Sequence, residues 1–107
     1  DRATITTPFY ANIFSYIPSK DRDGYAEMDE ATLLQVQDIP GFLGYEVTGP
    51  ETRRIFISYW KEMAAINLWR ENATHKKAKS HGKKWYAAYH SMLVKIESHS
   101  HWNPELL

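Results

Sequence analysis

The most informative stretch of the chain lies between residues 40 and 69, and it begins Pro40-Gly-Phe-Leu-Gly-Tyr-Glu46. It continues with Arg54-Ile-Phe-Ile-Ser-Tyr-Trp-Lys-Glu62, followed by Ala65, Ile66 and Trp69. The proline and glycine at its start end a helix. The two runs rich in aromatic and β-branched residues predict strands, and the last three residues share one face of a helix. The stretch therefore predicts a helix end, a strand, a turn, a strand and a helix.

The residues before this stretch predict one strand and one helix. Phe9 to Ile17 (FYANIFSYI) is rich in aromatic and β-branched residues, and Pro18 ends the predicted strand. Apolar residues then recur at helical spacing from Tyr25 to Val36, with acidic residues on the other face. The first half of the chain thus predicts strand, helix and strand in that order.

The residues after the stretch complete the pattern. We expect the second helix over Glu62 to Arg70, continuing in some form until Gly82 ends it. Trp85 to Tyr89 fits either a helix or a strand, and His90 to Glu97 predicts the last strand. The order β-α-β-β-α-β predicts an α+β, ferredoxin-like fold. Residues 1–107 form one domain, with a core over about 9–97 and a polar tail over 98–107.

The predicted strands are apolar on both faces. In the third strand one face carries Ile55, Ile57 and Tyr59, and the other carries Phe56, Ser58 and Trp60. The first strand has Phe9, Ala11, Ile13 and Ile17 on one face, and Tyr10, Phe14 and Tyr16 on the other. Two helices cover only one face of a four-stranded sheet, and the other would expose a large apolar patch. We therefore expect a homodimer in which the uncovered faces meet.

Composition excludes several classes of function. The 13 basic and 13 acidic residues balance, whereas a nucleic-acid binder needs an excess of basic side chains. The chain has no cysteine, so disulfides, thiolate catalysis and cysteine-bound metal centres are excluded. No apolar run approaches the ~18 residues of a membrane span, and the first residues lack the apolar core of a signal peptide. These features favour a cytoplasmic protein without a membrane or nucleic-acid partner.

The ordered motifs P-G-F-L-G-x-E, S-Y-W-x-E and A-I-x-x-W resemble the antibiotic biosynthesis monooxygenase superfamily. The later residues that fit the same pattern are His75, Gly82, Trp85, Tyr86 and Tyr89. The resemblance covers roughly Phe9 to Glu97, and it implies a dimeric α/β barrel. It implies less about the reaction, because the superfamily contains both enzymes and proteins of no known activity.

Three residues are candidates for chemistry under this resemblance, which implies a pocket between the helices and the sheet. Trp69 lies on the apolar stripe of the second helix, where it either packs in the core or faces the pocket. His75 follows six residues later and turns away by roughly 120° on a straight helix; it is a surface residue unless the helix breaks near Asn72. Asn12 is the one amide in its strand, and it either bonds a helix terminus or faces the pocket.

Haem-degrading members of the superfamily use an asparagine, a tryptophan and a histidine that binds iron. Asn12 and Trp69 resemble the first two residues, but Lys79 stands at the position of the histidine. A lysine ammonium group has no lone pair to coordinate iron at neutral pH. Haem degradation is therefore the third of three functional hypotheses, and we expect no cofactor.

Cofactor-independent members oxidise polycyclic phenols, whose deprotonated form supplies electrons to O2. Trp60 matches their strand tryptophan, while Phe56 and Ile66 replace their polar asparagine and tyrosine. The preferred hypothesis is such an oxidation of a small aromatic or quinone-like compound, with His75 and Asn12 as catalytic residues. The residues expected to bind substrate are Trp69, Phe14, Tyr10, Trp60 and Tyr86. The alternative is a non-enzymatic small-molecule-binding or stress-response module with the same barrel.

Two further patterns can each be interpreted as ordinary surface residues or as a functional site. Arg70, Lys76, Lys77, Lys79, Lys83 and Lys84 form a basic stretch. Such stretches are usually solvated helix faces, but this one could also attract an anionic ligand. His99 and His101, with His90, have the residue types of a metal site, but this spacing is common and weak. We expect no metal.

Overall fold

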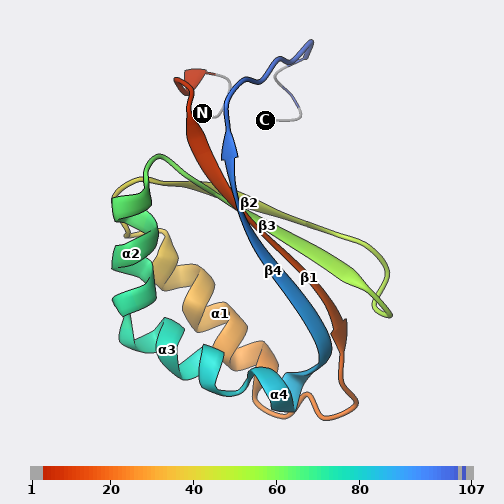
Figure 1. Ribbon diagram of the computed structural model, residues 1–107. Coiled ribbons are helices and arrows are strands. Elements are labelled where there is room, and N and C mark those ends of the chain that lie inside the picture. Colours follow the sequence, from red (N-terminus) through yellow and green to blue (C-terminus); the bar gives the residue numbers. More distant parts are fainter. Residues whose placement is uncertain (1–3, 104, 106–107) are drawn as a thin grey trace.

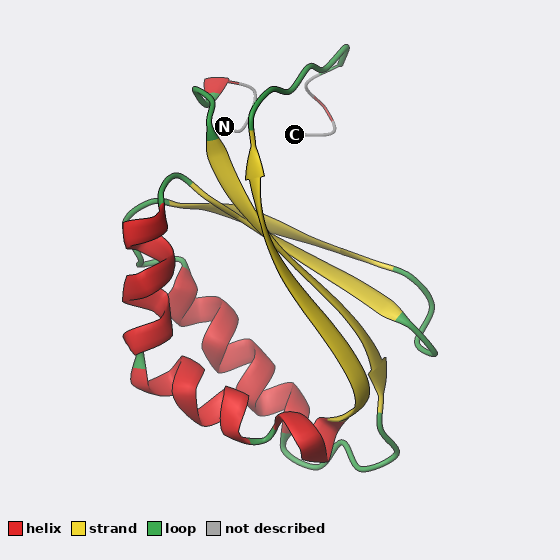
Figure 2. Ribbon diagram, in the orientation of Figure 1, coloured by secondary structure: helices red, strands yellow, loops and turns green. Residues whose placement is uncertain are grey.

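The computed structural model of the chain describes residues 4–103 and residue 105. Its elements are β1 (Phe9–Pro18), α1 (Tyr25–Val36), β2 (Phe42–Thr48), β3 (Arg54–Trp60), α2 (Met63–Glu71), α3 (Ala73–Ser80), α4 (Gly82–Trp85) and β4 (Tyr86–Ile96). The strands form one antiparallel sheet in the order β2-β3-β1-β4. Helices α1 to α4 all lie on one side of this sheet (Figures 1 and 2). The predicted α+β, ferredoxin-like fold is confirmed.

The last strand begins earlier than the sequence predicts. Local pattern placed its start at His90, but β4 begins at Tyr86, directly after the short helix α4. Pro18 pairs with Tyr86 and Tyr16 pairs with Tyr89. Because β4 pairs with the whole length of β1, tertiary pairing decides its start where the local signal is ambiguous.

The sheet register confirms that the two faces carry different rows of side chains. Asn12 lies between Ser58 of β3 and Leu93 of β4, and this row faces the helices. Ile13, the next residue, lies between Ile57 and Met92. Successive side chains in a strand point to opposite faces, so this second row faces away from the helices and is apolar.

The packed core lies at one end of the helix layer. Val36, Trp60, Ala65 and Ile66 form a buried cluster, and Tyr10, Ile39, Phe42, Met63 and Trp69 pack against it. The cluster joins α1 and α2 to the sheet where β3 ends. The opposite end of the helix layer is held differently, by α4 and the loop between β1 and α1.

The second predicted helix is not continuous, because the backbone is extended at Asn72 (φ −65°, ψ 129°). Asn72 Oδ1 accepts a hydrogen bond of 3.1 Å from the backbone N–H of His75, which caps α3. Its Nδ2 donates to Gln35 Oε1 on α1 at 3.2 Å. Asn72 therefore ends one helix, starts the next and ties both to α1.

Part of the tail contacts the domain. The ring of His99 packs edge-on against Phe9, with centroids 5.1 Å apart, and its Nε2 lies 3.2 Å from the carbonyl oxygen of Ile5. Phe9 is only 3% exposed, so this contact helps to cover the start of β1. No helix within residues 4–103 is long and apolar enough to cross a membrane.

We predict that Gly41→Ala destabilises the fold by about 2 kcal/mol or more. Gly41 has φ +91°, a conformation that side-chain-bearing residues rarely adopt, and an added Cβ would lie 2.8 Å from Cβ of Ala65. Its carbonyl oxygen also accepts a 2.7 Å hydrogen bond from the N–H of Lys61. Urea unfolding of the variant and the native chain measures the difference.

Gly82→Ala is the matched control. An added Cβ at Gly82 would lie 3.9 Å from the ring of Tyr89, an ordinary contact. We expect its free energy of unfolding to stay within about 0.5 kcal/mol of the native value. Equal losses in the two variants would contradict the role assigned to Gly41.

Candidate functional site

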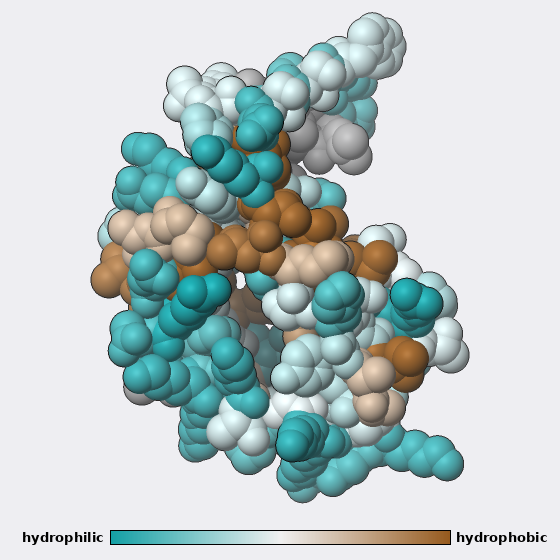
Figure 3. All heavy atoms as spheres, in the orientation of Figure 1, coloured by the Kyte–Doolittle hydropathy of each residue, from teal (hydrophilic) through white to brown (hydrophobic). Residues whose placement is uncertain are grey.

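A cavity of about 410 Å³ lies between the helix layer and the sheet, and Figure 3 shows the molecule hollowed there. The residues on its sheet side include Asn12, Phe14, Tyr16, Phe56, Ser58, Trp60, Tyr86, Tyr89 and Ser91. Those on its helix side include Tyr25, Asp29, Leu33, Trp69, Arg70, His75 and Lys79. This volume suits a small organic molecule.

Trp69 and His75 meet at the helix wall of the cavity. Their rings are stacked, with centroids 4.8 Å apart and an interplanar angle of 29°. On a straight helix these two side chains would point in different directions. The break at Asn72 brings them together, and both line the cavity.

His75 has an unsatisfied polar atom. Its Nδ1 is buried and has no hydrogen-bond partner among the described residues. Burial lowers the pKa of His75 below its ordinary value of 6.5, and the positive charges of Lys79 and Arg70 lower it further. A backbone interaction with Trp69 raises the pKa in part. The imidazole is therefore neutral at pH 7, and a ring nitrogen is available to accept a proton.

Asn12 also faces the cavity rather than a helix terminus. Its Nδ2 donates to Ser91 Oγ at 3.2 Å and to the carbonyl oxygen of Met92 at 3.1 Å, both on β4. These bonds orient the amide and use its donor side. The acceptor side, Oδ1, accepts no hydrogen bond from the described residues.

The structure places four of the five residues predicted to bind substrate in the cavity lining and one outside it. Phe14, Trp60, Trp69 and Tyr86 line the cavity together with Asn12 and His75. Trp60 is 2% exposed, and its Nε1 donates to Ser58 Oγ at 2.9 Å, so it forms a fixed part of the wall. Tyr10 is not among the lining residues and packs against the core cluster instead.

The sequence predicted Tyr86 as a substrate-binding residue, but it did not predict the cluster of tyrosines at the end of the cavity next to α4. Tyr16, Tyr25 and Tyr86 line this end, and the rings of Tyr16 and Tyr86 lie 5.0 Å apart. Burial raises the pKa of Tyr16 to about 12, helped by interaction with Tyr25. The available signal was weak: Tyr16 shares its strand face with Asn12, and Tyr25 begins the apolar stripe of α1.

Two members of the basic stretch reach the cavity, and the others lie outside its lining or on the surface. Arg70 and Lys79 line it beside His75. Lys76 instead pairs with Glu71 on the surface at 3.2 Å, a contact of little energetic weight. From the earlier acidic block Asp29 lines the cavity, and burial raises its pKa although Arg22 opposes this.

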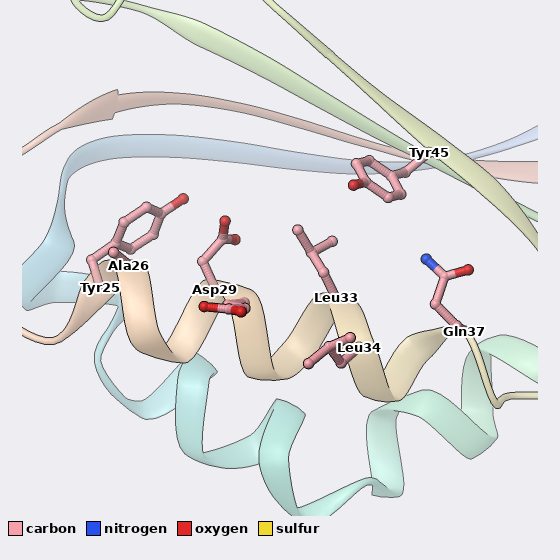
Figure 4. A pocket seen from close by; sticks show the side chains of 8 residues that line it. Tyr25, Ala26, Asp29, Leu33, Leu34, Gln37 and Tyr45 are labelled. Carbon is pink, nitrogen blue, oxygen red and sulfur yellow. The ribbon is translucent and has the colours of Figure 1, made fainter.

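A second, more open hollow of about 450 Å³ adjoins the cavity. Its lining residues are Tyr25, Ala26, Asp29, Glu30, Leu33, Leu34, Gln37 and Tyr45. Figure 4 shows Tyr25, Asp29 and Leu33 pointing from α1 toward the sheet. These three side chains line both hollows, so the open groove and the cavity share part of one wall.

The described residues contain no group of three metal-ligating side chains. Of the histidines considered for a metal, His99 packs against Phe9 instead.

The chain is an α+β domain with an internal cavity of small-molecule size. It belongs to the antibiotic biosynthesis monooxygenase family, whose profile matches residues 8–80. It is also 41% identical over 92 residues to uncharacterized protein YqjZ from Bacillus subtilis (strain 168). That match covers 84% of this chain and 81% of YqjZ.

Solved structures share the fold at low sequence identity. SnoaB, a cofactor-independent oxygenase from Streptomyces nogalater, matches with a TM-score of 0.72 and 9% identity, over 92% of this chain and 99% of SnoaB. A putative antibiotic biosynthesis monooxygenase from Nitrosomonas europaea matches with a TM-score of 0.68 and 16% identity. That match covers 79% of this chain and 95% of the other. At these identities the likeness shows the fold alone.

We predict that His75 makes the stability of the fold depend on pH. As the pH falls below 6.5, the unfolded chain binds a proton at His75 before the folded chain does, because the folded pKa is lowered. The free energy of unfolding should therefore fall from pH 6.5 down through the folded pKa. Above pH 6.5 both states are neutral, and this contribution is constant.

Urea unfolding at several pH values, for the native chain and His75→Gln, tests this prediction. The native chain should lose stability relative to the variant as the solution becomes acidic. A stability difference that does not change with pH would show that the folded pKa of His75 is not lowered.

Proposed function

We propose that this chain binds a small aromatic or quinone-like compound in the cavity and oxidises it with O2. One observation carries the proposal: a single cavity contains Asn12, Trp69 and a histidine, His75, whose buried Nδ1 has no hydrogen-bond partner among the described residues. Sequence alone left open whether Asn12 and His75 face this cavity. Membership of a monooxygenase family and a fold shared with a cofactor-independent oxygenase support the same reading.

His75 would act as the general base. A neutral imidazole beside the substrate accepts the proton of a phenol or of the enol form of an anthrone. Burial makes this histidine a weaker base, but the charges of Arg70 and Lys79 stabilise the anion that forms. The Oδ1 atom of Asn12 would help to orient the hydroxyl group before the proton moves.

The deprotonated substrate supplies the electrons. It transfers them to O2, a carbon–oxygen bond forms, and loss of water leaves a new carbonyl group. For an anthrone the balance is one CH2 group and one O2 giving one C=O group and one water. Oxygen is reduced, the ring carbon is oxidised, and the proton held by His75 returns to the departing water.

We propose that the reaction needs no resident cofactor. Haem is the alternative that the superfamily suggests, and the residues present do not suit it. Lys79 lines the cavity at the position of the iron ligand, and its ammonium group cannot coordinate iron. His75 is not at the position of the iron ligand, and its ring is stacked on that of Trp69. We derive no step through haem.

Oxygen uptake with anthrone tests the proposed reaction. We expect uptake above the rate without protein, and His75→Gln should lower kcat/KM by about 100-fold, the usual size of a general-base contribution. In the native protein kcat/KM should fall as the pH drops through the lowered pKa of His75. His101→Gln, which changes an exposed histidine of the tail, is the control and should keep the native rate.

The non-enzymatic alternative gives a different result in the same experiment. A binding module would retain aromatic ligands in equilibrium dialysis and would show no protein-dependent oxygen uptake. If the protein retains aromatic ligands but gives no oxygen uptake with any anthrone or hydroquinone, the enzyme proposal is refuted and the binding module remains.

We also propose that the uncovered sheet face joins two copies of the chain into a homodimer. Ile13, Ile57 and Met92 form one cross-strand row on this face. Ile17 and Met92 are 43% and 38% exposed. A row of this kind is costly to leave in water, and an identical face on a second copy would cover it. The balanced charge and the lack of cysteine fit an assembly in the cytoplasm.

Light scattering tests the dimer with one matched pair of variants. Met92→Asp places a charge on the proposed interface and should give a monomer. Leu34→Asp makes the same type of change on α1, where Leu34 is 66% exposed, and should leave the dimer intact. A native chain that is monomeric at about 100 μM, well above the dissociation constant of a stable dimer, would contradict the proposal.

A further inference from the structure

The end of the cavity next to α4 contains three tyrosines from three different elements. Tyr16 comes from β1, Tyr25 begins α1 and Tyr86 begins β4. All three line the cavity, and the Tyr86 ring lies 5.0 Å from Tyr16 and 6.1 Å from Tyr25. We call these residues the tyrosine end.

The hydroxyl groups of the tyrosine end can donate to a bound ligand. The three side chains line the same end of the cavity, and the ring of Tyr86 lies next to the other two. Each phenol hydroxyl carries one O–H donor. The tyrosine end therefore offers donor protons to an acceptor atom of a ligand.

These hydroxyl groups remain donors at every physiological pH. Burial raises the pKa of Tyr16 to about 12 and also raises the pKa of Tyr25 and Tyr86. Protonated phenols in a dry site favour a neutral acceptor such as a carbonyl oxygen. The nearby carboxylate of Asp29 makes an anionic ligand group unfavourable at this end.

The tyrosine end is held rigidly. The guanidinium group of Arg22 lies 3.6 Å above the Tyr25 ring, and its Nη1 donates to the carbonyl oxygen of Trp85 at 2.8 Å. Trp85 Nε1 donates to the carbonyl oxygen of Asp23 at 2.9 Å. These contacts fix the β1–α1 loop against α4, so a ligand would find the hydroxyl groups already in place.

The two polar ends of the cavity differ in chemistry and lie apart. Asn12 and Tyr16 share a strand face four residues apart, which corresponds to about 13 Å along β1. Near Trp69 the cavity has a neutral histidine and two cations, which suit a hydroxyl group that becomes an anion. Near α4 it has neutral donors, which suit a carbonyl group. A single aromatic ring is too short to reach both ends.

We infer that the tyrosine end is a subsite for a carbonyl oxygen of an aromatic ligand whose other polar group lies near His75. Phe14, whose ring lies 5.1 Å from that of Tyr86, would contact the rings between the two ends. The inference rests on the proposed function only in that the cavity binds aromatic compounds. It adds the carbonyl group, its position and the residues that recognise it.

Equilibrium dialysis with two soluble three-ring probes tests the subsite. The probes are 9,10-anthraquinone-2-sulfonate and anthracene-2-sulfonate, which share size and charge and differ in the carbonyl groups. We expect the native protein to bind the quinone about 5-fold more tightly, the size of one neutral hydrogen bond. Tyr86→Phe and Tyr16→Phe should each remove most of this preference, with the affinity for anthracene-2-sulfonate changed less than about 2-fold.

Tyr10→Phe is the matched control, because Tyr10 lies on the same strand as Tyr16 but outside the cavity lining. It should leave the preference for the quinone unchanged. Equal affinity of the native protein for the two probes, or a preference that survives in Tyr16→Phe, Tyr25→Phe and Tyr86→Phe alike, would overturn the inference.

The quinone probe is already oxidised, so its binding does not depend on turnover. A tyrosine-dependent preference with no oxygen uptake from anthrones would sustain the subsite and refute the proposed oxidation. Oxygen uptake that depends on His75, combined with no preference for the quinone, would support the proposed oxidation and refute the subsite.

Discussion

The hydrogen bonds of Asn72 are the constraint on which the candidate site depends. Its Oδ1 accepts from the N–H of His75 and its Nδ2 donates to Gln35. The first bond starts a new helix at a changed angle, and the second holds the junction against α1. Without this break, α2 and α3 would form one straight helix and His75 would turn away from Trp69. The break thus creates the helix wall of the cavity.

One physical cause sets the protonation of both polar ends of the cavity. Removal from water disfavours charge, so it lowers the pKa of His75 and raises the pKa of Tyr16. The same burial therefore leaves a neutral base at one end and neutral donors at the other. Arg70 and Lys79 act only near the histidine, and this local difference separates a place for a developing anion from a place for a carbonyl group.

The alternation of side chains along the strands forms both the sheet wall of the cavity and the apolar outer face. Asn12 and Tyr16 face the cavity, while Ile13, between them in the chain, faces away from the helices. A shift of one residue in the pairing of β1 would exchange the two sets. The pairing with β3 and β4 along the whole of β1 therefore fixes the cavity and the apolar outer face together.

The strand order, the first helix and the two apolar sheet faces could be predicted from local periodicity and from the Pro40-Gly41 helix end, although the start of β4 could not. The sequence also pointed to Asn12 and Trp69. The position of His75 could not be predicted in this way, because it depends on a side-chain hydrogen bond of Asn72 that periodicity does not reveal. The tertiary structure likewise excluded Tyr10 from the cavity and brought together three tyrosines distant in the chain. Helical and strand periods predict which face a residue occupies, whereas a cavity depends on how faces from separate elements are held apart.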